Sequence, residues 1–211
     1  HAVHHLRVAL VKFADGDGWS TYGQAEAAYG SSASSRSGAV FAGLHDRNNR
    51  IDIAASSDRG DDYEFDGGVV RATEYEREQY RFGYGHRFDD AESGPELHLG
   101  AVANRTGPSG TPALPMDIRY VESDQYSFEL DTGTGSGHLS LRASTLSVEH
   151  MMDNFTLRPP PLTPMGMPNY RQSDPRGDTD TAAVVWELEP AGWALALGAD
   201  ADWESHTGRI T

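Results

Sequence analysis

Hydrophobic and polar residues alternate along much of this chain with a period of two. From Gly192 to Glu204, alternate positions carry large apolar or alanine side chains from Trp193 to Trp203, and the positions between them carry Ala, Gly or acidic residues. Successive side chains of a β-strand point to opposite faces, so this pattern predicts a strand with one apolar and one polar face. Trp193 and Trp203 are ten residues apart, which in a tilted strand is about 25 Å, the height of the apolar band of an outer-membrane barrel.

The same alternation recurs in at least three further segments. Their apolar positions are Tyr80, Phe82, Tyr84 and Phe88; Leu97, Leu99, Ala101 and Ala103; and Ala182, Val184, Trp186 and Leu188. A soluble β-sandwich also alternates, but repetition along most of the chain, with Trp and Tyr at segment ends, favours a transmembrane β-barrel. We count about nine strands between Thr21 and the C-terminus, and therefore expect an all-β, antiparallel barrel wall.

The links between the expected strands are alternately short and long. Short links fall at His45–Asn49, Asp89–Gly94, Asp131–Ser136 and Glu189–Ala191, and long ones at Asp58–Glu74, Thr106–Asp117 and Arg158–Asp178. Outer-membrane barrels have short turns at one rim and long loops at the other, so all the long links should share one rim. Closed bacterial barrels have even strand numbers, so about nine strands fit part of a larger barrel.

Charge and cysteine content narrow the function classes. The 211 residues include 32 acidic and 17 basic ones, which gives a formal net charge of -15. Binding to nucleic acid needs a basic surface, so we expect no nucleic-acid partner. Cysteine is absent, so this chain alone has no disulfide and no thiolate metal site.

The five methionines mark the candidate metal site. All lie in or beside the long links: Met116, Met151, Met152, Met165 and Met167. In extended backbone, the side chains of His150 and Met152 leave the strand on one face, which by counting from Ser140 and Arg142 is the polar face, while Met151 points away. Imidazole and thioether groups are suitable ligands for Cu(I). The alternative is that the methionines are apolar filler between loops and that His150 is a surface residue.

The segment around this pair resembles the TonB-dependent copper receptors. Glu149-His150-Met151-Met152-Asp153-Asn154-Phe155-Thr156-Leu157-Arg158 is followed by a Pro-rich link with Met165-Gly166-Met167, as in that family. Weaker likenesses lie at Ala54–Tyr63 and at the Met116-Asp117 link before Tyr126–Leu130, so the resemblance runs from about Tyr22 to the end.

The resemblance implies the N-terminal part of a 22-stranded barrel in the outer membrane of a Gram-negative bacterium, plugged by a preceding domain and energised by the TonB complex. Residues 1–20 would be the tail of the plug or a lead-in, and residues 21–211 the partial barrel. His150 and Met152 would bind copper, the transported ion, together with a Cys and a Met of a Cys-x-x-x-Met motif in the plug. Neither that motif nor a plug is present in this chain. Met116, Met165 and Met167 would be secondary copper sites.

Two other functions stay open. A receptor of the same type could import a siderophore or another organic ligand, which would not require a His-x-Met pair. A barrel hydrolase could use Ser205 with His206 and Glu204, but neighbouring residues on a strand face opposite ways, and no Gly-x-Ser-x-Gly elbow is present. We therefore expect a transporter and not an enzyme. His1, His4 and His5, and the acidic run from Asp58 to Asp66, are weaker candidates for metal sites.

Overall fold

A computed structural model describes residues 18–31, 33–89, 94–110, 112–135, 137–188 and 193–210. His1, His4 and His5, and nearly all of the expected lead-in, lie outside these residues. Every regular element described is a strand, and no helix able to cross a membrane occurs in these ranges.

Nine long strands form one antiparallel sheet in the order of the sequence, interrupted only by a small hairpin. The sheet order is β1-β2-β3-β6-β7-β8-β9-β10-β11, and β4 pairs with β5. The strands are β1 (Ser20–Gly30), β2 (Ser35–His45), β3 (Asn49–Gly60), β4 (Tyr63–Phe65), β5 (Gly68–Val70), β6 (Tyr75–Arg87), β7 (Glu96–Thr106), β8 (Asp117–Thr134), β9 (Gly137–Asp153), β10 (Gln172–Leu188) and β11 (Leu195–Ile210).

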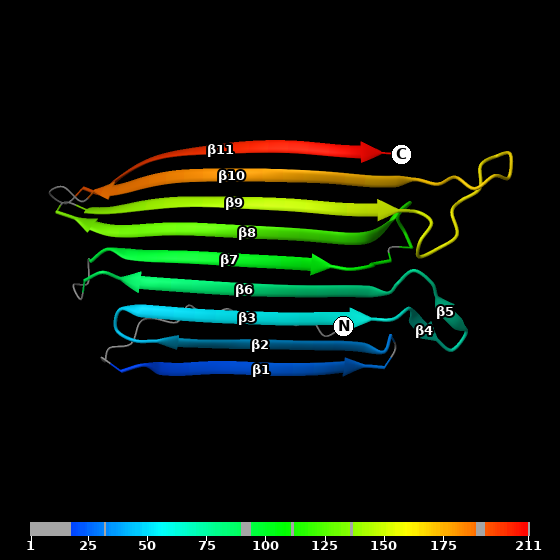
Figure 1. Cartoon of the computed structure of the whole chain (residues 1–211), viewed down its shortest axis with the longest axis horizontal. Coiled ribbons are helices and arrows are strands. Elements are labelled where there is room, and N and C mark those ends of the chain that lie inside the picture. The colour runs from blue at the N-terminus through cyan, green and yellow to red at the C-terminus, as the bar shows by residue number, and fades with distance from the viewer. Residues whose placement is uncertain are drawn as a thin grey trace.

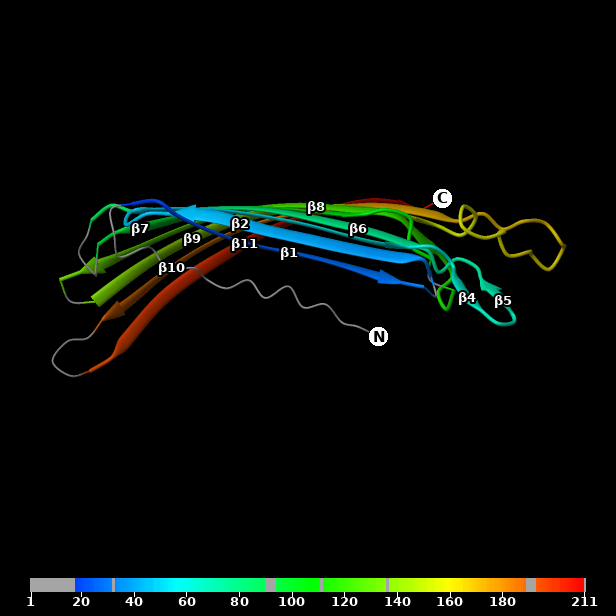
Figure 2. The same cartoon turned by 90° about the horizontal axis from the view of Figure 1, so that it is seen from below.

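The sheet is a single curved wall (Figures 1 and 2). Among the described residues, β1 and β11 each have a paired strand on one side only, so the wall is open. The expectation of an all-β antiparallel meander of about nine strands is confirmed. A total of 22 strands stays a prediction.

The long links share one rim, as the link lengths predict. The β3–β6 connection with its β4–β5 hairpin, the β7–β8 link and the β9–β10 link all lie at the right-hand end in Figure 1, together with the β1–β2 turn. The expected limit of the last link was wrong, because β10 begins at Gln172 and not after Asp178. Pro175 lies inside β10, and the pairing between β9 and β10 is interrupted at Asp174 and Pro175. Proline lacks the N–H that a ladder requires, which explains both the gap and the loop-like sequence.

Strand register divides the side chains into two faces. Directly paired residues share a face, so the convex face carries Val40, Ile53, Phe82, Leu99, Phe128, Val184 and Leu197. These side chains are exposed; Ile53, for example, is 54% exposed. They have no covering layer in the described structure, and they form the apolar band that the alternation predicts.

The apolar band is inclined to the hydrogen-bonded rows. One row reads Trp203, Asp180, Thr145, Tyr126, Ala101, Phe82, Ile53, Ala42 and Gly23 from β11 to β1. The row is apolar on β11 and from β8 to β2 but polar on β10 and β9, so the apolar segment is shifted along the strand between β9 and β8. Strands tilted to a barrel axis require this shift if the band is to stay level.

The opposite, concave face carries small and polar side chains. One of its rows reads Tyr22, Gly43, Asp52, Gly83, Gly100, Ser127, Ser144, Thr181 and Asp202 from β1 to β11. At Gly83 a Cβ atom would lie 2.6 Å from Oδ2 of Asp52, so glycine makes room for this buried carboxylate. Short side chains leave the middle of this face hollow.

Candidate functional site

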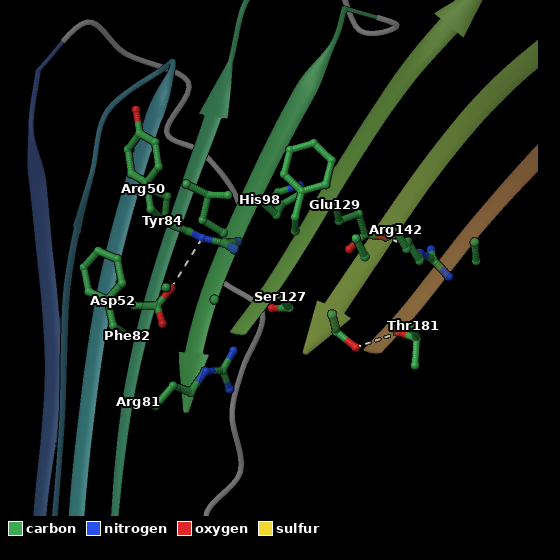
Figure 3. A pocket seen from close by; sticks show the side chains of 17 residues that line it. Arg50, Asp52, Arg81, Phe82, Tyr84, His98, Ser127, Glu129, Arg142 and Thr181 are labelled. Carbon is green, nitrogen blue, oxygen red and sulfur yellow. Dashed lines mark hydrogen bonds and ion pairs between the residues drawn. The ribbon is translucent and has the colours of Figure 1, made fainter. Parts of the chain in front are cut away.

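The hollow in the concave face is lined by charged and hydroxyl side chains from β3 to β10 (Figure 3). Nε of Arg142 donates to Oε1 of Glu129 at 2.6 Å, Nε of Arg50 lies 3.6 Å from Oδ1 of Asp52, and the hydroxyls of Ser144 and Thr181 are 2.8 Å apart. The register places Arg81, Glu96 and Arg142 on this face and places Phe82 and Leu139 on the other. The prediction for the faces of these five residues is confirmed.

His150 and Met152 lie at the long-link end of β9, on the same concave face. Pairing of β9 with β10 keeps one register from Gly137 to Asp153, so both residues share the face of Ser140 and Arg142. His150 is paired with Val121 of β8, and Met152 is paired with Ile118 of β8 and with Ser173 of β10. Met151 is paired with Tyr120 on the convex face. The predicted faces are therefore correct, and copper ligation by this pair stays a prediction.

The remaining candidate metal sites have less support from the geometry. In the described ranges, no group of three or more His, Cys, Asp or Glu side chains could hold a metal ion, and this covers the acidic run from Asp58 to Asp66. The link with Met165 and Met167 extends beyond the ends of the strands, and the two side chains are 80% and 54% exposed. Met116 is half-buried directly before β8. The secondary copper sites at these three methionines stay predictions.

A β-bulge interrupts the pairing of β8 with β9 beside Met152. Ile118 is paired with Met152 and Tyr120 with Met151, so Arg119 is an extra residue on β8. Its guanidinium reaches across to β9, where Nη1 lies 3.5 Å from Oδ2 of Asp153 and also donates to the Thr156 hydroxyl. Bulges often redirect a side chain in this way.

Asp153 closes the turn that follows Met152. Its Oδ1 accepts hydrogen bonds from the amides of Phe155 and Thr156 at 3.0 and 2.8 Å, and its Oδ2 accepts one from the Thr156 hydroxyl at 2.7 Å. Burial alone would raise the pKa of this carboxyl group, but the hydrogen bonds from Thr156 and Phe155 and the charge of Arg119 outweigh it and lower the pKa below its usual 3.8. Asp153 is therefore a buried, ionised anchor for the turn.

Asn154 joins the two ends of the β9–β10 link. Its side-chain amide donates to the carbonyl of Asn169 at 2.8 Å, and its side-chain oxygen accepts from the Arg171 amide at 2.8 Å. The backbone amide of Asn154 also donates to the Arg171 carbonyl at 3.2 Å. With 1% of its surface exposed, Asn154 fixes the base of the link.

Arg158 connects the β9–β10 link to the β7–β8 link. Its Nε lies 2.8 Å from Oδ2 of Asp117, and its Nη2 donates to Oδ1 of Asp117 at 2.9 Å and to the Leu114 carbonyl at 2.8 Å. Asp117 is completely buried. The hydrogen bond from Nη2 and the short ion contact of Nε with this buried carboxylate hold the two links together at this point.

The segment from Glu149 to Arg158 therefore has two parts with different structural roles. His150 and Met152 face the hollow side of the wall, whereas Asp153, Asn154, Thr156 and Arg158 hold the adjacent links. This anchoring role was not predicted from the sequence. Asp153 three residues before Thr156 is a local capping signal that could have been found, but the contacts to Asp117 and Arg119 join residues 41 and 34 positions apart.

Ser205 and His206 face opposite ways on β11, as expected. The register pairs Ser205 with Asp178 on the convex face and His206 with Gly177 on the concave face. Nε2 of His206 lies 3.4 Å from Oε2 of Glu204, two residues away on the same face. The geometry thus separates the candidate nucleophile from its candidate base.

Comparison with known proteins identifies the fold. No family model and no curated protein matches the sequence. Among solved structures, this chain is similar to one described as a copper transporter, OprC, with a TM-score of 0.81 and 17% sequence identity. The match covers 94% of this chain and 31% of that chain, so the chain spans about a third of the length of that protein. The chain therefore has the fold of the part of that protein that the match covers.

Proposed function

We propose that this chain is part of the wall of an outer-membrane, TonB-dependent receptor that imports copper in a Gram-negative bacterium. The observation that carries the proposal is the position of His150 and Met152, side by side on the concave face of a wall that matches a copper transporter in fold. The convex apolar band would face lipid. The polar hollow would face the plug domain, which connects to the TonB complex.

The chemistry of the pair suits Cu(I). Residues i and i+2 of a strand have Cα atoms about 6.5 to 7 Å apart, so an imidazole nitrogen and a thioether can converge on one ion. Their partners in the sheet are Val121 and Ile118 of β8 and Ser173 of β10, which offer one hydroxyl and no carboxylate to a hard cation. Two ligands bind an ion weakly, so the proposed site also requires the Cys and Met of the plug.

Met116, Met165 and Met167 would bind copper before it reaches His150 and Met152. All three belong to the links at the rim where copper would enter, and two are largely exposed. A thioether that binds Cu(I) there can release it to the deeper pair because single thioether contacts are weak.

The test is the copper content of the full-length protein that contains this wall, purified after exposure to copper and measured by elemental mass spectrometry. Wild type is compared with His150→Ala, Met152→Ala and the matched control Met151→Ala. We expect His150→Ala and Met152→Ala to lose most of the copper and Met151→Ala to keep it. Equal losses from Met151→Ala and Met152→Ala would refute the ligand assignment. A wild-type protein that takes up a ferric siderophore but no copper would instead identify an organic-ligand receptor.

A further inference from the structure

The bulge in β8 determines which side chain lies next to Met152. From Tyr120 to Thr134, β8 pairs with β9 in one register. If that register continued one residue beyond the Tyr120–Met151 pair, Arg119 would be paired with Met152. The bulge shifts the register by one residue, and Ile118 becomes the partner of Met152. A regular ladder would therefore place a guanidinium beside Met152 on the concave face, whereas the bulged one places an aliphatic side chain there.

The displaced arginine has a defined position elsewhere. It contacts Asp153 and Thr156, in the turn that directly follows Met152. Ile118 is in turn fixed on its other side, because its amide and carbonyl exchange hydrogen bonds of 3.1 and 2.9 Å with Ser109 of the β7–β8 link. Both residues of the irregularity are thus held in place, so the register shift is a stable feature of the wall.

We infer that this bulge excludes the positive charge of Arg119 from the copper-binding side of Met152, and that Ile118 is a positioning residue which keeps the thioether in an uncharged environment. The inference rests on the proposed function. A fixed cation about 7 Å from a bound monovalent ion, at an effective dielectric constant of about 40, opposes binding by an amount on the order of a tenfold loss of affinity.

Two single-residue deletions test the inference as a matched pair. Both remove the bulge and restore a regular ladder, and Asp117 stays opposite Asp153 in both. Deletion of Ile118 places Arg119 opposite Met152, whereas deletion of Arg119 leaves Ile118 there. The two variants therefore differ only in whether Arg or Ile faces the thioether.

The measurement is competitive Cu(I) titration of the full-length protein in detergent, at low and at high salt. We expect the Ile118 deletion to bind copper about tenfold more weakly than the Arg119 deletion, with a gap that narrows at high salt because ions screen the charge. Structural damage alone would not respond to salt in this way. Equal affinities of the two deletions, or a gap independent of salt, would overturn the inference.

Substitutions provide a second pair if the deletions prevent folding. With the bulge intact, Ile118→Arg should weaken copper binding by about tenfold and Ile118→Leu should not, and equal affinities would again overturn the inference. The His150→Ala variant separates the two proposals. If wild type binds no copper, or if His150→Ala binds it as wild type does, the proposed function fails. If His150→Ala loses copper while both matched pairs show no difference, only the inference about the bulge fails.

Discussion

The middle of the wall differs from the end of β8–β10 that carries the long links, which we call the outer end, in how its structure is determined. In the middle, pairing runs without a shift across nine strands, and each side chain's face follows from its parity. At the outer end, a bulge at Ile118, a pairing gap at Pro175 and three buried polar residues, Asp117, Asp153 and Asn154, replace that regularity. The regular part is an uninterrupted ladder with one apolar and one polar face, whereas the irregular part is held by specific polar contacts. The candidate copper pair lies where the two parts meet.

The largest expected effect on stability comes from removing the Arg158–Asp117 ion pair at the outer end. Arg158→Ala leaves the buried Asp117 carboxylate without the guanidinium that pairs with it, and removing one member of a buried ion pair costs about 3 to 5 kcal/mol. We expect the β7–β8 and β9–β10 links to separate and to become sensitive to brief proteolysis. Arg171→Ala is the matched control. Arg171 belongs to the same link, and its described contacts with Asn154 are made by its backbone and not by its side chain. Equal cleavage of both variants would show that the pair does not hold the links.

A smaller loss of stability should follow when a charged residue is introduced into the apolar band of the regular part. Phe128 and Gln125 are on the same strand but face opposite ways, and Phe128 belongs to the apolar band. Phe128→Arg should destabilise the protein by about 2 to 4 kcal/mol in lipid, and Gln125→Arg should change stability little. Denaturant titration of the full-length protein folded into vesicles measures both values. If the two arginines cost the same, the convex face does not contact lipid.

Sequence periodicity predicted the regular part well because each face of the sheet imposes one constraint on alternate residues. It yielded the strand number, the rim of the long links and the faces of Arg142 and Leu139. It could not yield the start of β10, since Asp174, Pro175 and Gly177 read as loop residues although they lie in a strand. Nor could it yield the bulge, because the register of β8 depends on contacts that Arg119 and Asp117 make with distant residues.

The smallest effect concerns pH at the turn after Met152. The pKa of Asp153 is lowered in the folded protein, so its ionised form stabilises the turn fully above pH 3.8 and this contribution disappears as the pH falls through the lower folded value. Amide hydrogen exchange at Phe155 and Thr156 should accelerate over that acid range, after correction for the intrinsic exchange rate. In Asp153→Asn the corrected rate should be flat there. A wild-type profile as flat as that of the variant would contradict the role of this carboxylate.

The alternation of short turns and long links also constrains how such a wall can evolve. Each strand reverses the direction of the chain, so the gain or loss of one strand would move every later long link to the opposite rim, and with it the outer end that holds His150 and Met152. A change of two strands restores the direction. Duplication or deletion of whole hairpins is therefore the step by which this architecture can change size and keep His150 and Met152 at the rim of the long links.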